Sequence, residues 1–144
     1  MRFIVLVKGD AESEAGALPD EKMLAEMNKY NEDLAEAGVL IAAEGLMPSS
    51  KGALVRFSGD ERTVIDGPFG DPNERVAGFW MLQVKSQEEA IEWIKRAPNP
   101  FPGKESDIEI RQVSEADDFG DNMTPELRQK EQRLAEKMAE NAKR

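Results

Sequence analysis

The run from Val76 to Val84 constrains the fold most, because it is apolar on both faces of any strand that it forms. Successive side chains of a strand point to opposite sides of the sheet. One side would carry Val76, Gly78, Trp80, Leu82 and Val84, and the other Phe79, Met81 and Gln83. Such a strand needs cover on both sides. The run therefore predicts a sheet with helices on one face and a second layer on the other.

Two sources could supply that second layer. In a homodimer, the sheets of two protomers would pack face to face and bury it. The C-terminal helix of the same chain could also cover it. We expect the homodimer, so the main predicted partner is a second copy of the chain.

Helical patterns alternate with strand patterns along the sequence. After Pro19-Asp20 an apolar stripe recurs at helical spacing and ends before Gly38; its members are Met23, Met27, Tyr30, Leu34 and Ala37. A second helix is predicted to begin at Ser86 with a capping box completed by Glu89, and to end before Pro98. A third begins at Thr124-Pro125.

The strand candidates are residues 3–7, 39–43, 53–57, 63–65, 76–84 and 108–113, and the small, acidic stretch 9–17 is predicted to be a loop. This order predicts an α+β fold with a ferredoxin-like antiparallel sheet, helices on one face, an inserted hairpin and a C-terminal helix. The predicted domain spans residues 1–113. Residues 114–144 form a predicted C-terminal extension with an amphipathic helix.

Composition excludes several classes of function. The 144 residues include no Cys and no His, so thiol and histidine catalysis are excluded, and we expect no tightly bound metal and no cofactor. A net charge of −10 disfavours binding to nucleic acid or to anionic membranes. The first apolar run, residues 3–7, is too short for a secretion signal, so a cytoplasmic protein is predicted.

Few side chains are candidates for chemistry. Asp66 begins the turn Asp66-Gly67-Pro68-Phe69, where its carboxylate could accept hydrogen bonds from backbone amides or serve as a pocket acid or base. Glu44 follows a strand end and could line a cleft. Arg111, in the last strand, could hold a substrate anion or pair with Glu44, Asp66 or Glu109.

The sequence resembles the YCII-related family, and specifically its DGPF branch. The match rests on residues 66–69 together with 1–7, 44–49, 63–65, 77–80, 88–93 and 108–111. The resemblance implies a dimeric α+β barrel built from ferredoxin-like protomers. It also adds Ser49 and Phe69 to Glu44 and Arg111 as candidate ligand-binding residues. The family's usual Ala-Glu-x-Lys-Glu continuation is absent, because residues 70–74 read Gly-Asp-Pro-Asn-Glu.

Some DGPF relatives are associated with extracytoplasmic-function sigma factors, which implies a regulatory context. The enzymatic His-Asp pair proposed for other YCII members cannot be present in a chain without His. The first hypothesis is therefore a non-catalytic homodimer that binds a small organic ligand or has a regulatory role. The alternative is an enzyme of the dimeric α+β barrel type, with Asp66 or Glu44 as acid or base on a small organic substrate.

Overall fold

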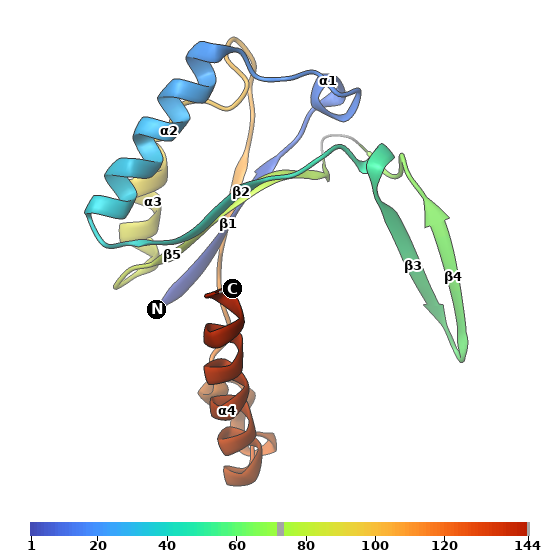
Figure 1. Ribbon diagram of the computed structural model, residues 1–144, viewed down its shortest axis with the longest axis vertical. Coiled ribbons are helices and arrows are strands. Elements are labelled where there is room, and N and C mark those ends of the chain that lie inside the picture. The colour runs from blue at the N-terminus through green and yellow to red at the C-terminus, as the bar shows by residue number, and fades with distance from the viewer. Residues whose placement is uncertain (72–73, 144) are drawn as a thin grey trace. The chain divides into compact units, whose positions relative to one another are not determined.

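The computed structural model describes residues 1–71 and 74–143. These residues divide into two compact units, Met1–Gln112 and Val113–Arg144. In the first unit, the described strands form a four-stranded antiparallel sheet in the order β2-β5-β1-β6 (Figure 1). Its strands are β1 (Arg2–Lys8), β2 (Leu40–Gly45), β5 (Val76–Gln83) and β6 (Ile108–Gln112). Helix α2 (Glu21–Glu36) connects β1 to β2, and α3 (Gln87–Lys95) connects β5 to β6, which confirms the ferredoxin-like arrangement.

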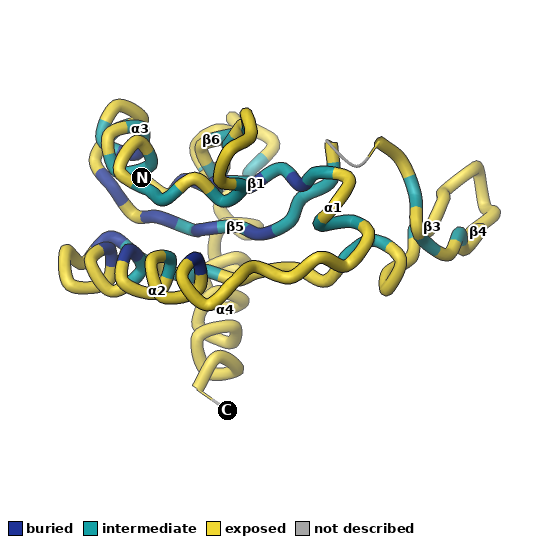
Figure 2. The backbone as a smooth tube through the Cα atoms, turned by 90° about the horizontal axis from the view of Figure 1, so that it is seen from above, coloured by how far each residue is buried: buried dark blue, intermediate teal, exposed yellow. Residues whose placement is uncertain are grey.

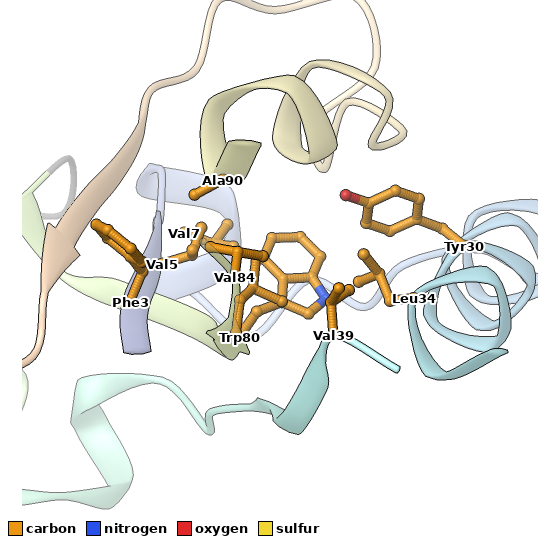
Figure 3. Packing of buried hydrophobic residues seen from close by; sticks show 10 residues of the cluster. Phe3, Val5, Val7, Tyr30, Leu34, Val39, Trp80, Val84 and Ala90 are labelled. Carbon is orange, nitrogen blue, oxygen red and sulfur yellow. The ribbon is translucent and has the colours of Figure 1, made fainter. Parts of the chain in front are cut away.

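The core lies between the sheet and these two helices. Figure 2 shows buried residues mainly in β1, β5 and the inner side of α2. Tyr30 and Leu34 project from α2 toward Trp80 of β5 (Figure 3). The rings of Tyr30 and Trp80 meet edge to face, with centroids 5.9 Å apart. The Tyr30 hydroxyl donates to the carbonyl of Trp93 at 2.5 Å, and Trp80 Nε1 donates to Asn31 Oδ1 at 2.7 Å. The aromatic polar atoms are therefore paired inside the core.

Side-chain caps set the helix boundaries. Asp20 accepts a hydrogen bond from the Met23 amide at 2.8 Å, which satisfies one free donor at the start of α2. After α2, Gly38 has a φ of 77°, a value that suits glycine. Ser86 accepts from the Glu89 amide at 3.1 Å, as predicted for α3. The Glu89 carboxylate, however, accepts from the Lys85 amide at 2.8 Å, one residue before the amide that a capping box would use.

Residues 9–17, predicted to be a loop, contain the short helix α1 (Ala11–Glu14). Its capping box is reciprocal: Asp10 accepts from the Ser13 amide at 2.8 Å, and the Ser13 hydroxyl accepts from the Asp10 amide at 2.9 Å. The loop prediction was wrong because four residues are too few to show helical periodicity. The capping pair is the stronger signal in a segment this short.

The second face of the main sheet, away from α2 and α3, is also apolar at its centre. Ile4 and Leu6 lie directly opposite Met81 and Phe79 in the antiparallel register. All four are partly exposed, whereas their neighbours Val5, Trp80 and Leu82 on the helix side are buried. This confirms that β5 is apolar on both faces.

Strands β3 (Ala53–Ser58) and β4 (Glu61–Asp66) form a separate two-stranded hairpin (Figure 1). Val55 pairs with Val64, and Phe57 pairs with Arg62. The Arg62 guanidinium stacks on the Phe57 ring at 4.4 Å, and Phe57 is 70% exposed. The base of this hairpin, next to the 3₁₀ helix η1 (Ser49–Lys51), leads into the site described below.

The second unit contains the 3₁₀ segment η3 (Ala116–Asn122) and helix α4 (Pro125–Ala142). Thr124 caps α4 by accepting from the Leu127 amide at 3.2 Å, with Pro125 in the first turn as predicted. Arg128 pairs with Asp117 at 2.8 Å, which links the two segments of this unit. No helix of the described residues is apolar over a length that would cross a bilayer.

Candidate functional site

A pocket of about 430 Å³ lies where α1, the β2–β3 connection and the β4–β5 connection meet. This volume falls within the usual range for small-molecule sites, roughly 300–1,000 Å³. The apolar side chains of its wall are Leu46, Met47, Pro48, Ala53, Phe69 and Val76. The described polar and charged side chains are Glu14, Ser49, Lys51 and Arg75. An apolar wall with a few convergent polar groups is typical of a ligand site.

Ser49 links three segments of the wall. Its amide donates to Glu14 Oε1 at 3.0 Å, and its hydroxyl donates to Glu14 Oε2. The same hydroxyl oxygen accepts from the Phe69 amide at 3.3 Å. The last residue of α1, the first residue of η1 and the turn after β4 are thereby held together.

These contacts lower the pKa of Glu14 below its ordinary value. The Ser49 hydroxyl is the main cause, the Ser49 amide the second, and the positive charge of Arg75 adds to them, while desolvation acts in the opposite direction. Glu14 is therefore a carboxylate at neutral pH, and both of its oxygens accept from Ser49.

Arg75 also lines the pocket. Its guanidinium lies over the Phe69 ring, 4.6 Å from the centroid, and its carbonyl accepts from the Gly9 amide at 2.7 Å. It also packs on Gly70, where a Cβ would lie 1.5 Å from an Arg75 terminal nitrogen. Arg75 Nε is buried and has no hydrogen-bond partner among the described residues.

The turn before Phe69 requires a glycine at position 67. A Cβ on Gly67 would lie 1.7 Å from the Ser49 carbonyl oxygen. The Gly67 amide donates to the Gly52 carbonyl at 3.0 Å, which fixes the turn against the end of η1. The Gly-Pro bond that follows, Gly67–Pro68, is cis. The glycine thus permits the close approach that places Phe69 in the pocket wall.

Residues 1–116, which include every residue of this pocket, match the YCII-related domain family. The chain belongs to the YCII-related family. An uncharacterized protein of Rhizobium meliloti (strain 1021) is 30% identical over 95 residues, which are 66% of this chain and 76% of that protein. Assignment to the DGPF branch rests on residues 66–69 and the segments quoted with them, and it stays a prediction.

One solved structure similar to this YCII-related chain is a 5-chloro-2-hydroxyhydroquinone dehydrochlorinase from Burkholderia phenoliruptrix AC1100, in complex with 2,5-dihydroxybenzoquinone. It is 15% identical, with a TM-score of 0.43, and the match covers 79% of this chain and 94% of the other.

Of the site residues predicted from sequence, the YCII-related domain brings Ser49 and Phe69 together in the pocket wall. Asp66 lies one turn earlier, at the end of β4, where it pairs with Ala53 and is exposed. Its carboxylate accepts no hydrogen bond from a described backbone amide, unlike the expectation for a turn-capping Asp. Glu44 is also exposed.

Arg111 lies on β6 with its side chain 72% exposed, and its Nε is 3.7 Å from the Glu109 carboxylate. Of the three acidic partners considered for it, Glu109 is the one that it pairs with. The pocket of the YCII-related domain therefore contains neither Arg111 nor the acids Asp66 and Glu44.

Sequence reasoning missed the three charged residues of the wall, Glu14, Lys51 and Arg75. The contact of Glu14 with Ser49 joins residues 35 apart, and no local pattern indicates such a pair. The sequence carries only a weak indication of Arg75. Residues 70–74, just before it, depart from the usual continuation of the family, and they include Gly70, on which the Arg75 guanidinium packs.

The described residues of the YCII-related domain contain no group of three His, Cys, Asp or Glu side chains placed to hold a metal ion. The charged side chains of the pocket wall, Lys51 and Arg75 against Glu14, give a local charge of about +1. The whole chain carries −10, so the sign of the pocket is opposite to that of the protein.

Proposed function

We propose that this YCII-related protein is a non-catalytic homodimer that binds a small organic ligand in the Glu14–Arg75 pocket. The observation that carries the proposal is the pocket itself: about 430 Å³, mostly apolar side chains, and polar groups from α1, η1 and the β4–β5 connection that converge on it. Sites of this composition bind small molecules through apolar contact and orient them with few polar groups.

The charge state of Glu14 supports binding over catalysis. A general base that works near neutral pH needs a pKa close to that pH, whereas Ser49 lowers the pKa of the Glu14 carboxyl further below it. Asp66 and Glu44, the acids of the enzymatic alternative, are exposed and outside the pocket wall. Without a pocket acid of raised pKa, a binding role is better supported.

The second sheet face supports a homodimer. A contiguous apolar patch crosses β1 and β5 and consists of Ile4, Leu6, Phe79 and Met81. The charged residues Glu109 and Arg111 lie beside this patch on β6. An apolar centre with a polar rim is typical of an interface between protomers. A regulatory role, linked to sigma factors in DGPF relatives, is part of the same proposal and follows from the resemblance alone.

A pocket-blocking variant tests the ligand site. Ala53 lines the pocket and is exposed, so Ala53→Trp should fill the cavity without entering the core. Ala139→Trp, on the exposed surface of α4, is the matched control. In a thermal-shift screen of small metabolites, we expect compounds that stabilise the wild type and the control but not Ala53→Trp. Equal stabilisation of all three proteins, or no stabilising compound, would contradict the proposal.

Light scattering tests the dimer. At micromolar concentration we expect about twice the 16.0 kDa protomer mass. Met81→Glu, on the second sheet face, should give the protomer mass, whereas Leu24→Glu, on an exposed position of α2, should leave the dimer intact. A wild-type mass equal to that of one protomer would remove the dimer from the proposal.

A further inference from the structure

The pocket wall combines an apolar surface with an excess of positive charge. Two cations, Lys51 and Arg75, face one anion, Glu14. Lys51 is exposed to solvent, so Arg75 is the cation that a ligand in the pocket would meet most closely. A ligand with an apolar body and a single negative charge complements both properties of the wall.

Glu14 does not neutralise Arg75 by direct contact. Both of its carboxylate oxygens accept hydrogen bonds from Ser49, and the described residues include no ion pair between Glu14 and Arg75. The effect of Arg75 on Glu14 is a Coulombic interaction only. The guanidinium is therefore not capped by the carboxylate nearest to it in the wall.

Arg75 is also held in position before any ligand arrives. Its guanidinium stacks on the Phe69 ring at 4.6 Å and lies against Gly70, and its carbonyl is bound by the Gly9 amide. A fixed guanidinium loses less conformational freedom on binding than a mobile one. Its Nε is buried and has no described partner, so a ligand in the pocket would reach the terminal nitrogens of the guanidinium rather than Nε.

We propose that the pocket binds small monocarboxylates with an apolar body, and that Arg75 receives the carboxylate group while the side chains of Leu46, Met47 and Pro48 contact the body. This inference rests on the proposed ligand-binding function and adds its chemical class. The planar guanidinium matches two carboxylate oxygens, a geometry that an ammonium group cannot reproduce.

Matched acid and amide pairs test the inference. The probes are phenylacetate and hexanoate with their primary amides, which keep the shape and remove the charge. Binding to the full-length protein is measured by isothermal titration calorimetry. We expect each acid to bind at least about tenfold more tightly than its amide, because hydrogen bonds to a charged group contribute more than neutral ones.

The variant Arg75→Gln should abolish this preference and bind acid and amide alike. Arg62→Gln is the matched control, since Arg62 also stacks on a phenylalanine ring, that of Phe57 at 4.4 Å, but lies outside the pocket wall. The control should keep the wild-type preference. Circular dichroism melts show whether each variant is folded, and Arg75→Lys, which keeps the charge, provides a second variant expected to retain part of the preference.

The outcomes separate the two proposals. If acids and amides bind the wild type equally well, or if Arg75→Gln keeps the preference while folded, the monocarboxylate inference is overturned and ligand binding stands. If neither member of either pair binds, the monocarboxylate inference is overturned as well. If the metabolite screen also finds nothing, the ligand-binding function fails with it.

Discussion

The carbonyl oxygen of Ser49 occupies the space that a side chain at Gly67 would need, 1.7 Å from an ideal Cβ. Gly67→Ala must therefore displace η1 or the turn before Phe69. We expect it to destabilise the protein by about 3 kcal/mol, the upper part of the usual range for overpacking. Denaturant melts measure this. Gly45→Ala, where a Cβ meets nothing within 4 Å, should change the free energy of unfolding far less.

Phe69 and Phe57 each carry a stacked arginine, so their contributions to stability can be compared. Phe69 is partly buried beneath Arg75, whereas Phe57 is 70% exposed beneath Arg62. We expect Phe69→Ala to cost about 2 kcal/mol of stability and Phe57→Ala about 0.5 kcal/mol. Urea unfolding of both variants shows which substitution lowers the free energy of unfolding more. Equal losses would show that Phe69 does not support the pocket.

Asp66→Asn should leave stability within about 0.5 kcal/mol of the wild type, because its exposed carboxylate accepts no hydrogen bond from a described backbone amide. The sequence alone suggests a larger cost, from a carboxylate that caps the turn. A chemical melt distinguishes these results. A loss above about 1 kcal/mol would restore the capping role.

Glu14 predicts a specific dependence on pH. Its pKa is lowered in the folded protein relative to the ordinary 4.5, so this carboxyl stabilises the fold at higher pH. That contribution is complete above the unfolded-state pKa and is lost as pH falls through the lower folded-state pKa. Thermal melts of wild type and Glu14→Gln should converge as the pH falls below 4.5. Asp10, whose pKa is also lowered, is present in both proteins and does not contribute to the difference.

Tyr30 predicts the behaviour at alkaline pH. Burial raises its pKa to about 12 from 10.0, because the charged phenolate is poorly solvated in the core. The unfolded chain ionises first, so stability should fall as pH rises from about 10 to 12. Because Tyr30 is the only tyrosine, tyrosinate absorbance reports on it directly. Tyr30→Phe should remove this part of the pH dependence, at the cost of the hydrogen bond to Trp93.

The fold could be predicted from sequence because its signals are periodic and local. The stripe that contains Tyr30 and Leu34 identifies α2, and the double apolar pattern of Val76–Val84 identifies a central strand. The pocket depends instead on contacts between distant residues. Ser49 and Phe69 were included through the family resemblance, whereas Glu14 belongs to a helix of four residues that shows no period.

Three residues that were predicted for the site lie outside the pocket wall: Asp66, Glu44 and Arg111. Residue type and position in a strand or turn made them candidates, but neither property determines whether a side chain faces a cavity. The register of β4 ends with Asp66 beside Ala53, in solvent, and only the next turn brings Phe69 back to the wall. The cytoplasmic location and the lack of a bound metal or cofactor stay predictions.

The bridge through Ser49 has a consequence for how binding is measured. Its two side-chain links join residues 35 and 20 positions apart, so no short fragment of the chain contains all three segments of the pocket wall. Binding of the proposed ligand would therefore report on the folded fraction of the chain. A substitution in the core around Trp80 that leaves a substantial fraction of the chain unfolded would weaken the apparent affinity without touching the pocket. A change in the affinity of a variant should therefore be interpreted together with the unfolding curve of that variant.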